Sequence, residues 1–293
     1  MNKWPDFFIV GAAKSGTTSL YHYLREHPSI FMSSLKEPRF FTVYGEEFIN
    51  PPPNFQIKIV GNTNEYLSLF RDANQSQIKG EASTIYLFLY QKAIQNMAKL
   101  MENYQAKKII IILRNPVERA FSHYQMYLLG GHENEIFSQA IQNNKRNNLL
   151  KQWPFYDYIS PGFYSNQVKA YLSQFNKVFV CLHEDLKYDT PKIIKKMYDF
   201  LDVDPSFTPN YKKNYNQGGT DRIYTGMKGN LRRAKHYFEA SLGKKNFYPY
   251  PYKSKNDMYQ DYCKVYNKLA SIFKKDIVIL QEYIERDLSS WML

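Results

Sequence analysis

The sequence predicts an α/β fold in which helices flank a central, mainly parallel sheet, giving three layers. The first observation is that the strand-like segments are apolar throughout, as strands buried on both faces are. The second is that amphipathic helical segments alternate with them, which is typical of a parallel sheet covered on both sides. A chain of 293 residues is long enough for such a fold, so we expect a single domain over residues 1–293.

The elements can be placed in order along the chain. The predicted strands are residues 7–11, 30–32, 107–113 and 178–182. The predicted helices are residues 15–26, 65–70, 87–101, 115–129, 166–175 and 190–201, followed by two helices within residues 257–288 that break near Lys275-Asp276. The helix at residue 115 has the clearest start, because Asn115 is a good N-cap and Pro116 suits the first helical position.

Composition narrows the class of protein. Hydrophobic residues make up 44% of the chain and charged residues 23%, which excludes wholesale disorder and collagen-like structure. The longest apolar run, residues 109–113, is far shorter than a membrane span, and residues 1–6 show no signal-peptide pattern. Cys181 and Cys263 lie far apart in strand-like and helix-like contexts, so we expect reduced thiols in a cytoplasmic protein.

The chain is basic, with 39 Lys and Arg residues against 27 Asp and Glu residues and a net charge of +12. Such a surplus favours partners that are polyanionic or phosphorylated. Nucleic acid, anionic lipid, nucleotides and acidic sugars all fit this charge, so charge alone does not choose among them.

A candidate phosphate-binding loop, GAAKSGTT, occupies residues 11–18 between the first strand and the first helix. Its small residues let backbone N–H groups converge on an anion, and the helix N-terminus adds a favourable dipole. The glycines have the spacing of the P-loop motif G-x-x-x-x-G-K-[ST], but Thr17 replaces its lysine, and Lys14 lies inside the loop instead. The segment therefore predicts a P-loop-like fold. The different position of the lysine argues against ordinary ATP and Mg²⁺ chemistry.

A second anion site is predicted within residues 114–124, RNPVERAFSHY. Arg114 follows a buried strand, at the edge where open α/β sheets bind ligands, and Ser122 lies about two turns into the next helix. An arginine and a hydroxyl placed in this way can hold a terminal phosphate through charge-assisted hydrogen bonds. The alternative is a solvated arginine at the start of an ordinary helix.

Together these segments resemble the sulfotransferases that use 3′-phosphoadenosine-5′-phosphosulfate (PAPS) as donor. Residues 7–18 are similar to the family's 5′-phosphosulfate loop, and residues 109–124 (IIIILRNPVERAFSHY) to its 3′-phosphate motif. KEPRFF, at residues 36–41, resembles the Lys-Glu-Pro motif of the heparan-sulfate-type and bacterial carbohydrate-type branch. Further matches to that branch follow in family order over nearly the whole chain, at residues 80–83, 162–175, 184–186 and 276–291.

The resemblance implies in-line transfer of a sulfuryl group from PAPS to a hydroxyl or amine of a sugar or small-molecule acceptor, leaving 3′-phosphoadenosine-5′-phosphate (PAP). It also implies that Lys14 assists the leaving group, that Glu37 is the general base and that Lys36 contacts the sulfonate. No metal is expected, because Lys14 and the helix dipole supply positive charge. The residues expected to bind the nucleotide are Ala13, Lys14, Ser15, Gly16, Thr17, Thr18, Arg114, Ser122, Lys228 and Gly229.

Two departures from the branch weaken the case for a glycosaminoglycan acceptor. Arg39 stands where some members carry His, and Ala82 stands where some carry Lys. The acceptor stays open between a sugar hydroxyl, an amino sugar, a lipid headgroup, and a hydroxyl or nitrogen of a bacterial natural product. His123 and His132 are the nearest alternatives to Glu37 as base, but neither lies in a base motif of the family, and we expect both to be structural or solvated.

Two other classes of function compete with this interpretation. A P-loop kinase or NTPase fits the glycine spacing but requires the Walker lysine and an acidic Mg²⁺ ligand. A non-enzymatic basic module that binds nucleic acid or a sulfated polymer fits the net charge, and it predicts steep salt dependence with no special need for Lys14. The resemblance instead favours a soluble cytoplasmic enzyme of bacterial type, with no nucleic-acid partner and no membrane span. It leaves the oligomeric state open.

Overall fold

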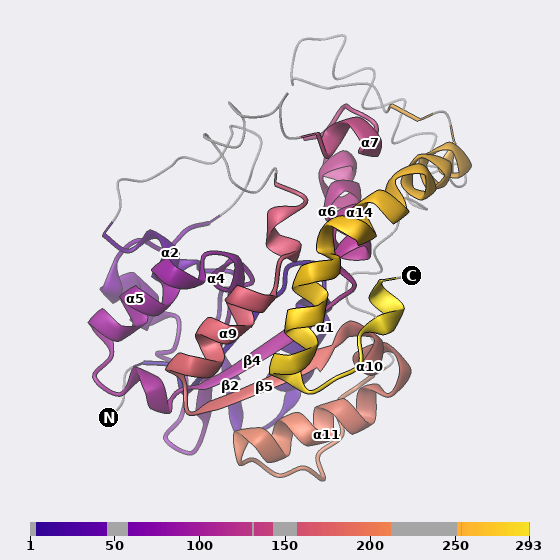
Figure 1. The fold of residues 1–293 in the computed structure, drawn as a ribbon. Coiled ribbons are helices and arrows are strands. Elements are labelled where there is room, and N and C mark those ends of the chain that lie inside the picture. Colours follow the sequence, from indigo (N-terminus) through magenta and orange to yellow (C-terminus); the bar gives the residue numbers. More distant parts are fainter. Residues whose placement is uncertain are drawn as a thin grey trace.

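A computed structural model of the chain describes residues 4–45, 58–130, 132–142, 157–211, 251–252 and 254–292. Five strands pair in parallel in the order β2-β3-β1-β4-β5 (Figure 1). They are β1 (Phe7–Gly11), β2 (Ile30–Met32), β3 (Ile78–Ala82), β4 (Lys108–Leu113) and β5 (Lys177–Leu182). The predicted α/β fold with a central parallel sheet is confirmed.

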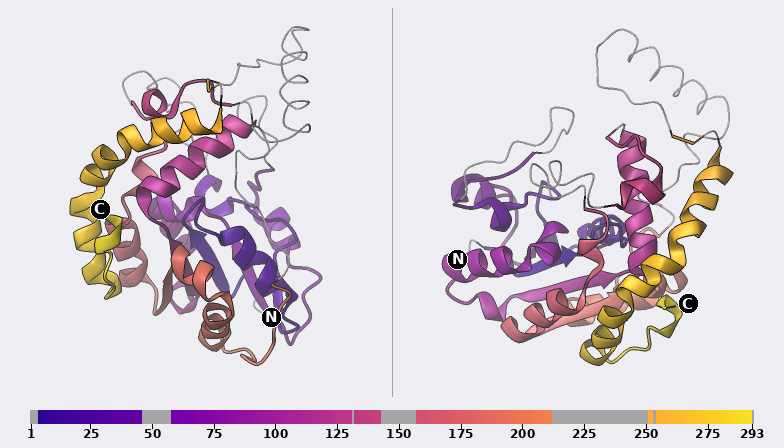
Figure 2. Two further views of the ribbon diagram at one scale, coloured as in Figure 1. Left: turned by 90° about the vertical axis from the view of Figure 1, so that its right-hand side faces the viewer. Right: turned by 45° about the horizontal axis from the view of Figure 1, so that its top comes forward.

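Helices cover both faces of this sheet. The helices within the described residues are α1 (Thr17–Glu26), α2 (Phe40–Val43), α3 (Thr63–Ser68), α4 (Ile85–Phe88), α5 (Tyr90–Leu100), α6 (Pro116–Gly130), α7 (Phe137–Ala140), α9 (Ser165–Gln174), α10 (His183–Tyr188), α11 (Thr190–Leu201) and α14 (Lys255–Ile284). One face packs against α1 and α11, and the other against α4, α5 and α9 (Figure 2). The long helix α14 packs against α6, α7 and α9.

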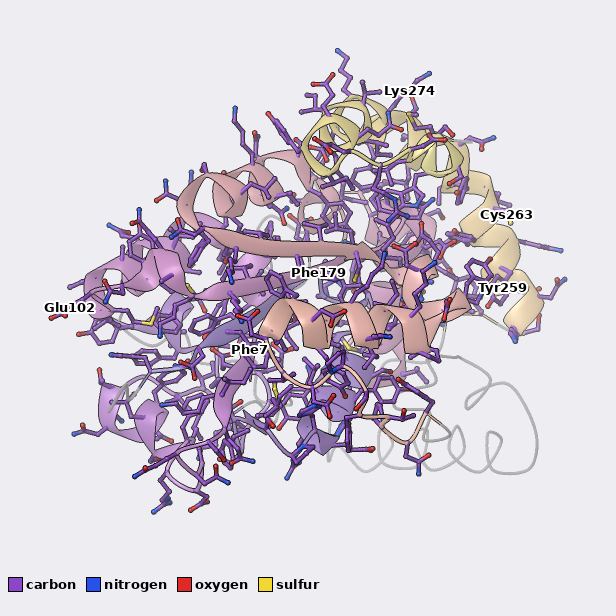
Figure 3. All side chains as sticks on the ribbon, turned by 90° about the horizontal axis from the view of Figure 1, so that it is seen from below. Phe7, Glu102, Phe179, Tyr259, Cys263 and Lys274 are labelled. Atoms are coloured by element: carbon purple, nitrogen blue, oxygen red, sulfur yellow. The ribbon has the colours of Figure 1, made fainter. Side chains whose placement is uncertain are left out.

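Strand β1 shows why the strands are apolar throughout. Phe7 and Ile9 pack in the core on the α1 and α11 side, Phe8 and Val10 pack in the core on the other side, and all four are fully buried. Seen from below, α11 lies across the sheet near Phe179 of β5 (Figure 3), whose ring centroid is 5.5 Å from that of Phe200 in α11. Each strand therefore needs apolar side chains in both directions.

The sequence did not predict β3, which lies in the sheet between β2 and β1. Lys79, Gly80 and Glu81 interrupt the apolar pattern that marks the other strands. Glycine is needed here because a Cβ at residue 80 would lie only 2.1 Å from the Phe7 ring. The segment is therefore a strand whose side-chain pattern reflects close packing and, as described below, a buried carboxylate.

The predicted break near Lys275-Asp276 is wrong. Helix α14 runs through both residues without interruption for 30 residues, and no glycine or proline occurs within it. Asp276 instead has a tertiary role, because its carboxylate accepts hydrogen bonds from the backbone N–H groups of Tyr164 and Ser165 at the start of α9. In the sequence, Lys275-Asp276 has the charges expected at an exposed helix end. In the structure, Asp276 forms a contact between α14 and α9.

Candidate active site

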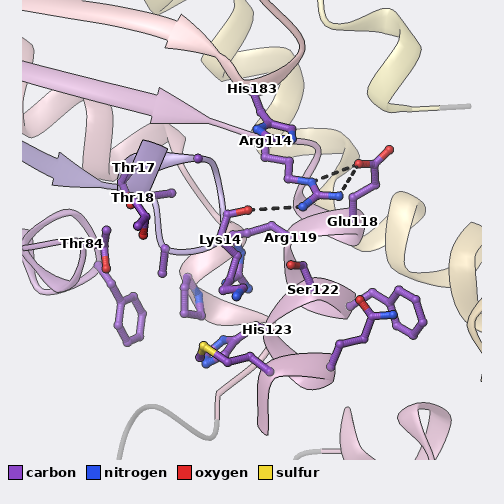
Figure 4. Close-up of a pocket in the computed structure, with 18 of the residues that line it drawn as sticks. Lys14, Thr17, Thr18, Thr84, Arg114, Glu118, Arg119, Ser122, His123 and His183 are labelled. Carbon is purple, nitrogen blue, oxygen red and sulfur yellow. Dashed lines mark hydrogen bonds and ion pairs between the residues drawn. The ribbon is translucent and has the colours of Figure 1, made fainter. Parts of the chain in front are cut away.

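A cavity of about 990 Å³ lies at the carboxyl ends of the strands (Figure 4). Segments that follow β1, β3, β4 and β5 contribute to its wall, together with the turn at residues 36–39. Its described lining includes five cationic side chains and two carboxylates, namely Lys14, Lys36, Arg39, Arg114, Arg119, Glu37 and Glu118. This excess of positive charge suits an anionic ligand.

The loop between β1 and α1 has the backbone of an anion site. Gly16 has a φ of 101° and Lys14 a φ of 70°, so both lie in the left-handed region that side chains rarely adopt. A Cβ on residue 16 would also lie 3.2 Å from Leu186 and 3.3 Å from His183. No side chain among the described residues caps the N-terminus of α1, so its first N–H groups can bind an anion in the cavity.

The Lys14 side chain lies in the cavity among other cations. Burial lowers its pKa to about 8, and the charges of Arg114, Lys36 and Arg119 act in the same direction. The ammonium group is therefore mostly protonated at neutral pH, and none of the described residues supplies it with a compensating negative charge. A bound anion would stabilise the protonated form.

Arg114 connects the two predicted phosphate sites. Its Nη1 donates to the carbonyl oxygen of Lys14 at 3.3 Å, while Nε and Nη2 donate to Oε2 of Glu118 at 3.0 and 2.9 Å (Figure 4). His183 supports the same loop from α10, with Nδ1 3.0 Å from the carbonyl oxygen of Ser15. These contacts hold the carbonyl groups of Lys14 and Ser15 in place.

Most of the nucleotide-binding residues predicted from the sequence do meet in the cavity. Those that line it are Ala13, Lys14, Gly16, Thr17, Thr18, Arg114 and Ser122. Ser15 does not line it, because its side chain is fully buried and its Oγ has no hydrogen-bond partner within the described residues. Lys228 and Gly229 lie outside the described residues.

The predicted catalytic pair, Lys36 and Glu37, also lines the cavity. Lys36 Nζ lies 2.9 Å from Glu37 Oε1, and Thr84 donates to the same carboxylate from its backbone N–H and its hydroxyl, at 2.9 and 3.0 Å. Burial alone would raise the pKa of Glu37, but the charges of Lys36 and Arg39 and these hydrogen bonds outweigh it and lower the pKa. Glu37 has a φ of 63°, so the turn is held in a strained conformation.

A second carboxylate, Glu81 of β3, interacts electrostatically with Glu37 of this turn. It belongs to the family match at residues 80–83, but the resemblance implied no chemical role for it. It is fully buried, accepts a hydrogen bond from the Tyr66 hydroxyl at 3.1 Å, and is not part of the described cavity lining. Burial raises its pKa to about 7, and the charge of Glu37 adds to that rise. The two carboxylates therefore have pKa values shifted in opposite directions, which is a common arrangement in acid–base sites.

The two histidines considered as alternative bases both line the cavity. His123 is buried, and its ring packs edge-on against Tyr127 and Tyr158, which fits the predicted structural role. Burial, with the nearby charges of Arg119 and Lys14, lowers the pKa of His123 well below its ordinary value. His132 is partly exposed, and burial lowers its pKa too. Both rings therefore line the same cavity as Glu37, the predicted base.

The fold and this cavity define a class of protein: an α/β group-transfer enzyme with a phosphate-binding loop at the carboxyl edge of its sheet. The sequence profile of the sulfotransferase domain matches residues 4–276. The chain therefore belongs to the sulfotransferase domain family.

Known relatives agree with this assignment. A crystal structure of a sulfotransferase from Alicyclobacillus acidocaldarius has 29% sequence identity and a TM-score of 0.73, with 99% of both chains covered. Human bifunctional heparan sulfate N-deacetylase/N-sulfotransferase 2 is 26% identical over 213 residues, which is 70% of this chain and 22% of that protein. Mouse carbohydrate sulfotransferase 15 is 25% identical over 254 residues, which is 69% of this chain and 44% of that protein. The chain thus spans less than half the length of these curated relatives.

The described part of the chain contains no cluster suited to a metal ion, since no three or more of its His, Cys, Asp or Glu side chains are arranged to hold one. None of the described helices is both long and apolar enough to cross a membrane. Cys181 and Cys263 are both free thiols, the first buried and the second exposed.

Proposed function

We propose that this chain transfers a sulfuryl group from PAPS to a hydroxyl or amine of a carbohydrate or small-molecule acceptor. The observation that carries the proposal is the placement of Lys14 within a phosphate-binding loop, in one cavity with Arg114, Ser122 and Glu37. These residues come from three separate segments of the sequence, each of which resembles a sulfotransferase motif.

The residues of the cavity fit a donor that carries two phosphate-bearing ends. The uncapped N-terminus of α1, with Thr17 and Thr18, can hold one phosphate, and Arg114 with Ser122 can hold another. The five cations of the lining exceed its two carboxylates by three charges, which a bisphosphate would offset. Burial is the largest cause of the lowered pKa of Lys14, and the charges of Arg114, Lys36 and Arg119 add to it, so a bound anion would favour the protonated ammonium.

PAPS, when bound, supplies a sulfuryl group attached to a phosphate leaving group. Lys14 stabilises the negative charge that develops on the bridging oxygen as the bond from sulfur to that oxygen breaks. Glu37 accepts the proton of the acceptor hydroxyl or amine as the new bond to sulfur forms, because its carboxylate lines the cavity and its lowered pKa keeps it ionised. Lys36 holds the carboxylate in place at 2.9 Å.

The named activities of the relatives support a carbohydrate as the first acceptor class to test. Two of those proteins are heparan sulfate and carbohydrate sulfotransferases. We keep amines beside hydroxyls because one of these relatives is an N-sulfotransferase. A reducing, cytoplasmic location is part of the proposal, and the free thiols of Cys181 and Cys263 are compatible with it.

The test is to incubate the purified chain with PAPS and a panel of sugars, amino sugars, phenols and lipid headgroup analogues, and to measure PAP formation. We expect PAP to form with at least one acceptor, and no phosphoryl transfer when ATP and Mg²⁺ replace PAPS. Phosphoryl transfer from ATP, with no turnover of PAPS, would contradict the proposal and favour a kinase.

A further inference from the structure

A second group of polar side chains lines the cavity from a different stripe of α6. Arg119 and His123 lie one helical turn apart and are only 0% and 5% exposed, yet both contribute to the lining. Figure 4 shows them beside Lys14, apart from the Arg114–Glu118 pair, and both interact electrostatically with Lys14. Neither residue belongs to the two phosphate sites described above.

Arg119 has hydrogen-bonding capacity that the described protein does not use. Its Nη2 donates to the carbonyl oxygen of Tyr158, but Nε and Nη1 have no hydrogen-bond partner among the described residues. Asp157 favours the charged guanidinium through its field, although its Oδ1 accepts hydrogen bonds from the backbone of Ile159 and Ser160. A buried guanidinium with open N–H groups is costly unless an anion completes it.

His123 presents a second open group next to this guanidinium. Its Nδ1 is buried and has no hydrogen-bond partner within the described part of the chain. The ring is fixed from two sides, with its centroid 5.0 Å from that of Tyr127 and 5.1 Å from that of Tyr158. A neutral imidazole held in this way can donate one hydrogen bond from Nδ1.

The face of α6 that carries Arg119 and His123 also carries a residue that interacts with the turn of the candidate base. Residue Tyr127, one further turn along α6, interacts electrostatically with Arg39, which in turn interacts with Glu37. Arg119 and His123 therefore line the cavity beside Lys14, on the same helix as a residue that interacts with Arg39 of the Lys36–Arg39 turn.

We propose that Arg119 and His123 form an oxyanion subsite that holds the sulfuryl group of the donor, separate from the two phosphate sites. The inference rests on the proposed function, since it assumes a donor with a sulfuryl group. Arg119 offers two unpartnered nitrogens, which carry three N–H bonds, and His123 offers one nitrogen. The three oxygens of a sulfuryl group can accept hydrogen bonds from them. Because PAP lacks the sulfuryl group, only the binding of PAPS should depend on this subsite.

The experiment compares the dissociation constants of PAP and PAPS by calorimetry, without any acceptor. Arg119→Gln is expected to weaken PAPS binding about 10- to 100-fold and to leave PAP binding within about threefold, as for loss of hydrogen bonds to a charged group. His123→Phe keeps the ring contacts and removes Nδ1, and it should weaken PAPS binding about 3- to 10-fold. Arg71→Gln is the control, because it makes the same chemical change on the surface, outside the cavity.

The outcomes separate this inference from the proposed function. Absence of PAP and PAPS binding by the wild-type chain would contradict the proposed function itself. Normal binding of both ligands by a folded Arg119→Gln variant, or an equal loss for PAP and PAPS, would overturn the subsite. If Arg119→Gln does not fold, His123→Phe decides: an unchanged ratio of the PAPS and PAP dissociation constants would overturn the inference.

Discussion

Arg114 and Lys14, far apart in the sequence, are joined by a hydrogen bond of 3.3 Å from the guanidinium Nη1 to the lysine carbonyl oxygen. The contact couples the end of β4 to the loop after β1. It supports the left-handed backbone conformation of Lys14, so that the lysine side chain lies in the cavity beside the arginine. The proposed mechanism uses this ammonium group to stabilise the charge that develops on the phosphate leaving group.

Replacing Lys14 by Met should remove most of the turnover while the fold survives. The ammonium group is placed to stabilise charge on the leaving oxygen, and loss of one such preorganised donor lowers the rate about 10²- to 10³-fold. The measurement is PAP release at saturating PAPS, with the thermal midpoint as the check on folding. Turnover at the wild-type rate in a folded Lys14→Met variant would contradict the mechanism.

The lowered pKa of Lys14 predicts that PAP binding takes up a proton near pH 8. Bound phosphate favours the protonated ammonium and raises its pKa above about 8, so affinity should fall by up to about tenfold per pH unit above that value. The stability of the free protein has the opposite pH dependence. Between pH 8 and the ordinary lysine pKa of 10.5 the unfolded chain binds more protons than the folded one, so the free energy of unfolding rises with pH. Calorimetry in two buffers of different ionisation enthalpy measures the uptake, and Lys14→Met should abolish it.

The pH dependence of turnover distinguishes the two carboxylates. If Glu37 is the base, its lowered pKa predicts a rate that stays level from pH 8 down to about pH 4.5. If Glu81 were the base, its pKa of about 7 would make the rate fall below neutral pH. We expect Glu37→Gln to reduce kcat about 10²- to 10⁴-fold with little change in PAP affinity. A larger loss of kcat in Glu81→Gln, with an acid limb near pH 7, would transfer the role to Glu81.

The position of β3 predicts the effect of a methyl group at residue 80. Gly80→Ala should destabilise the protein by about 1–3 kcal/mol, because the new Cβ overlaps the buried Phe7 ring. Gly61→Ala is the matched control, since a Cβ there meets nothing within 4 Å, and its effect should stay within about 1 kcal/mol. Denaturant unfolding of both variants measures the difference. Equal stability of the two would contradict the packing of β3 against Phe7.

The sequence predicted those features of the fold that depend on local pattern. Strand β4 follows from its apolar run, and helix α11, with its bounds at Thr190 and Leu201, follows from the Thr190-Pro191 start and the apolar pattern after it. Strand β3 could not be predicted in this way, because Gly80 packs against Phe7 and Glu81 is hydrogen-bonded to Tyr66, and both partners lie on other elements. The break predicted in α14 failed for a similar reason, since Asp276 contacts the start of α9.

In the candidate site, too, the sequence predicted the residues that belong to motifs but not those defined by tertiary packing. The motifs alone predicted that Lys14, Arg114 and the Lys36–Glu37 pair belong to one site, and all four side chains line the cavity. The roles of Glu81 and Arg119 could not be predicted, because what sets them apart is complete burial, and burial of a charged side chain is a property of the folded molecule. Both residues lie in segments that resemble the family, residues 80–83 and 109–124, and a charged residue in an otherwise apolar strand or helix face is the sequence signal that points to their burial.

The most direct test of the sulfotransferase assignment is thermal unfolding with PAP, and separately with ATP and Mg²⁺. A ligand at about 100 times its dissociation constant adds roughly 2.7 kcal/mol to the free energy of unfolding. For a chain of this size that raises the Tm by about 5 °C. We predict this shift with PAP and none with ATP and Mg²⁺. A shift with ATP and Mg²⁺ but not with PAP would contradict the assignment of the cavity to a sulfuryl donor.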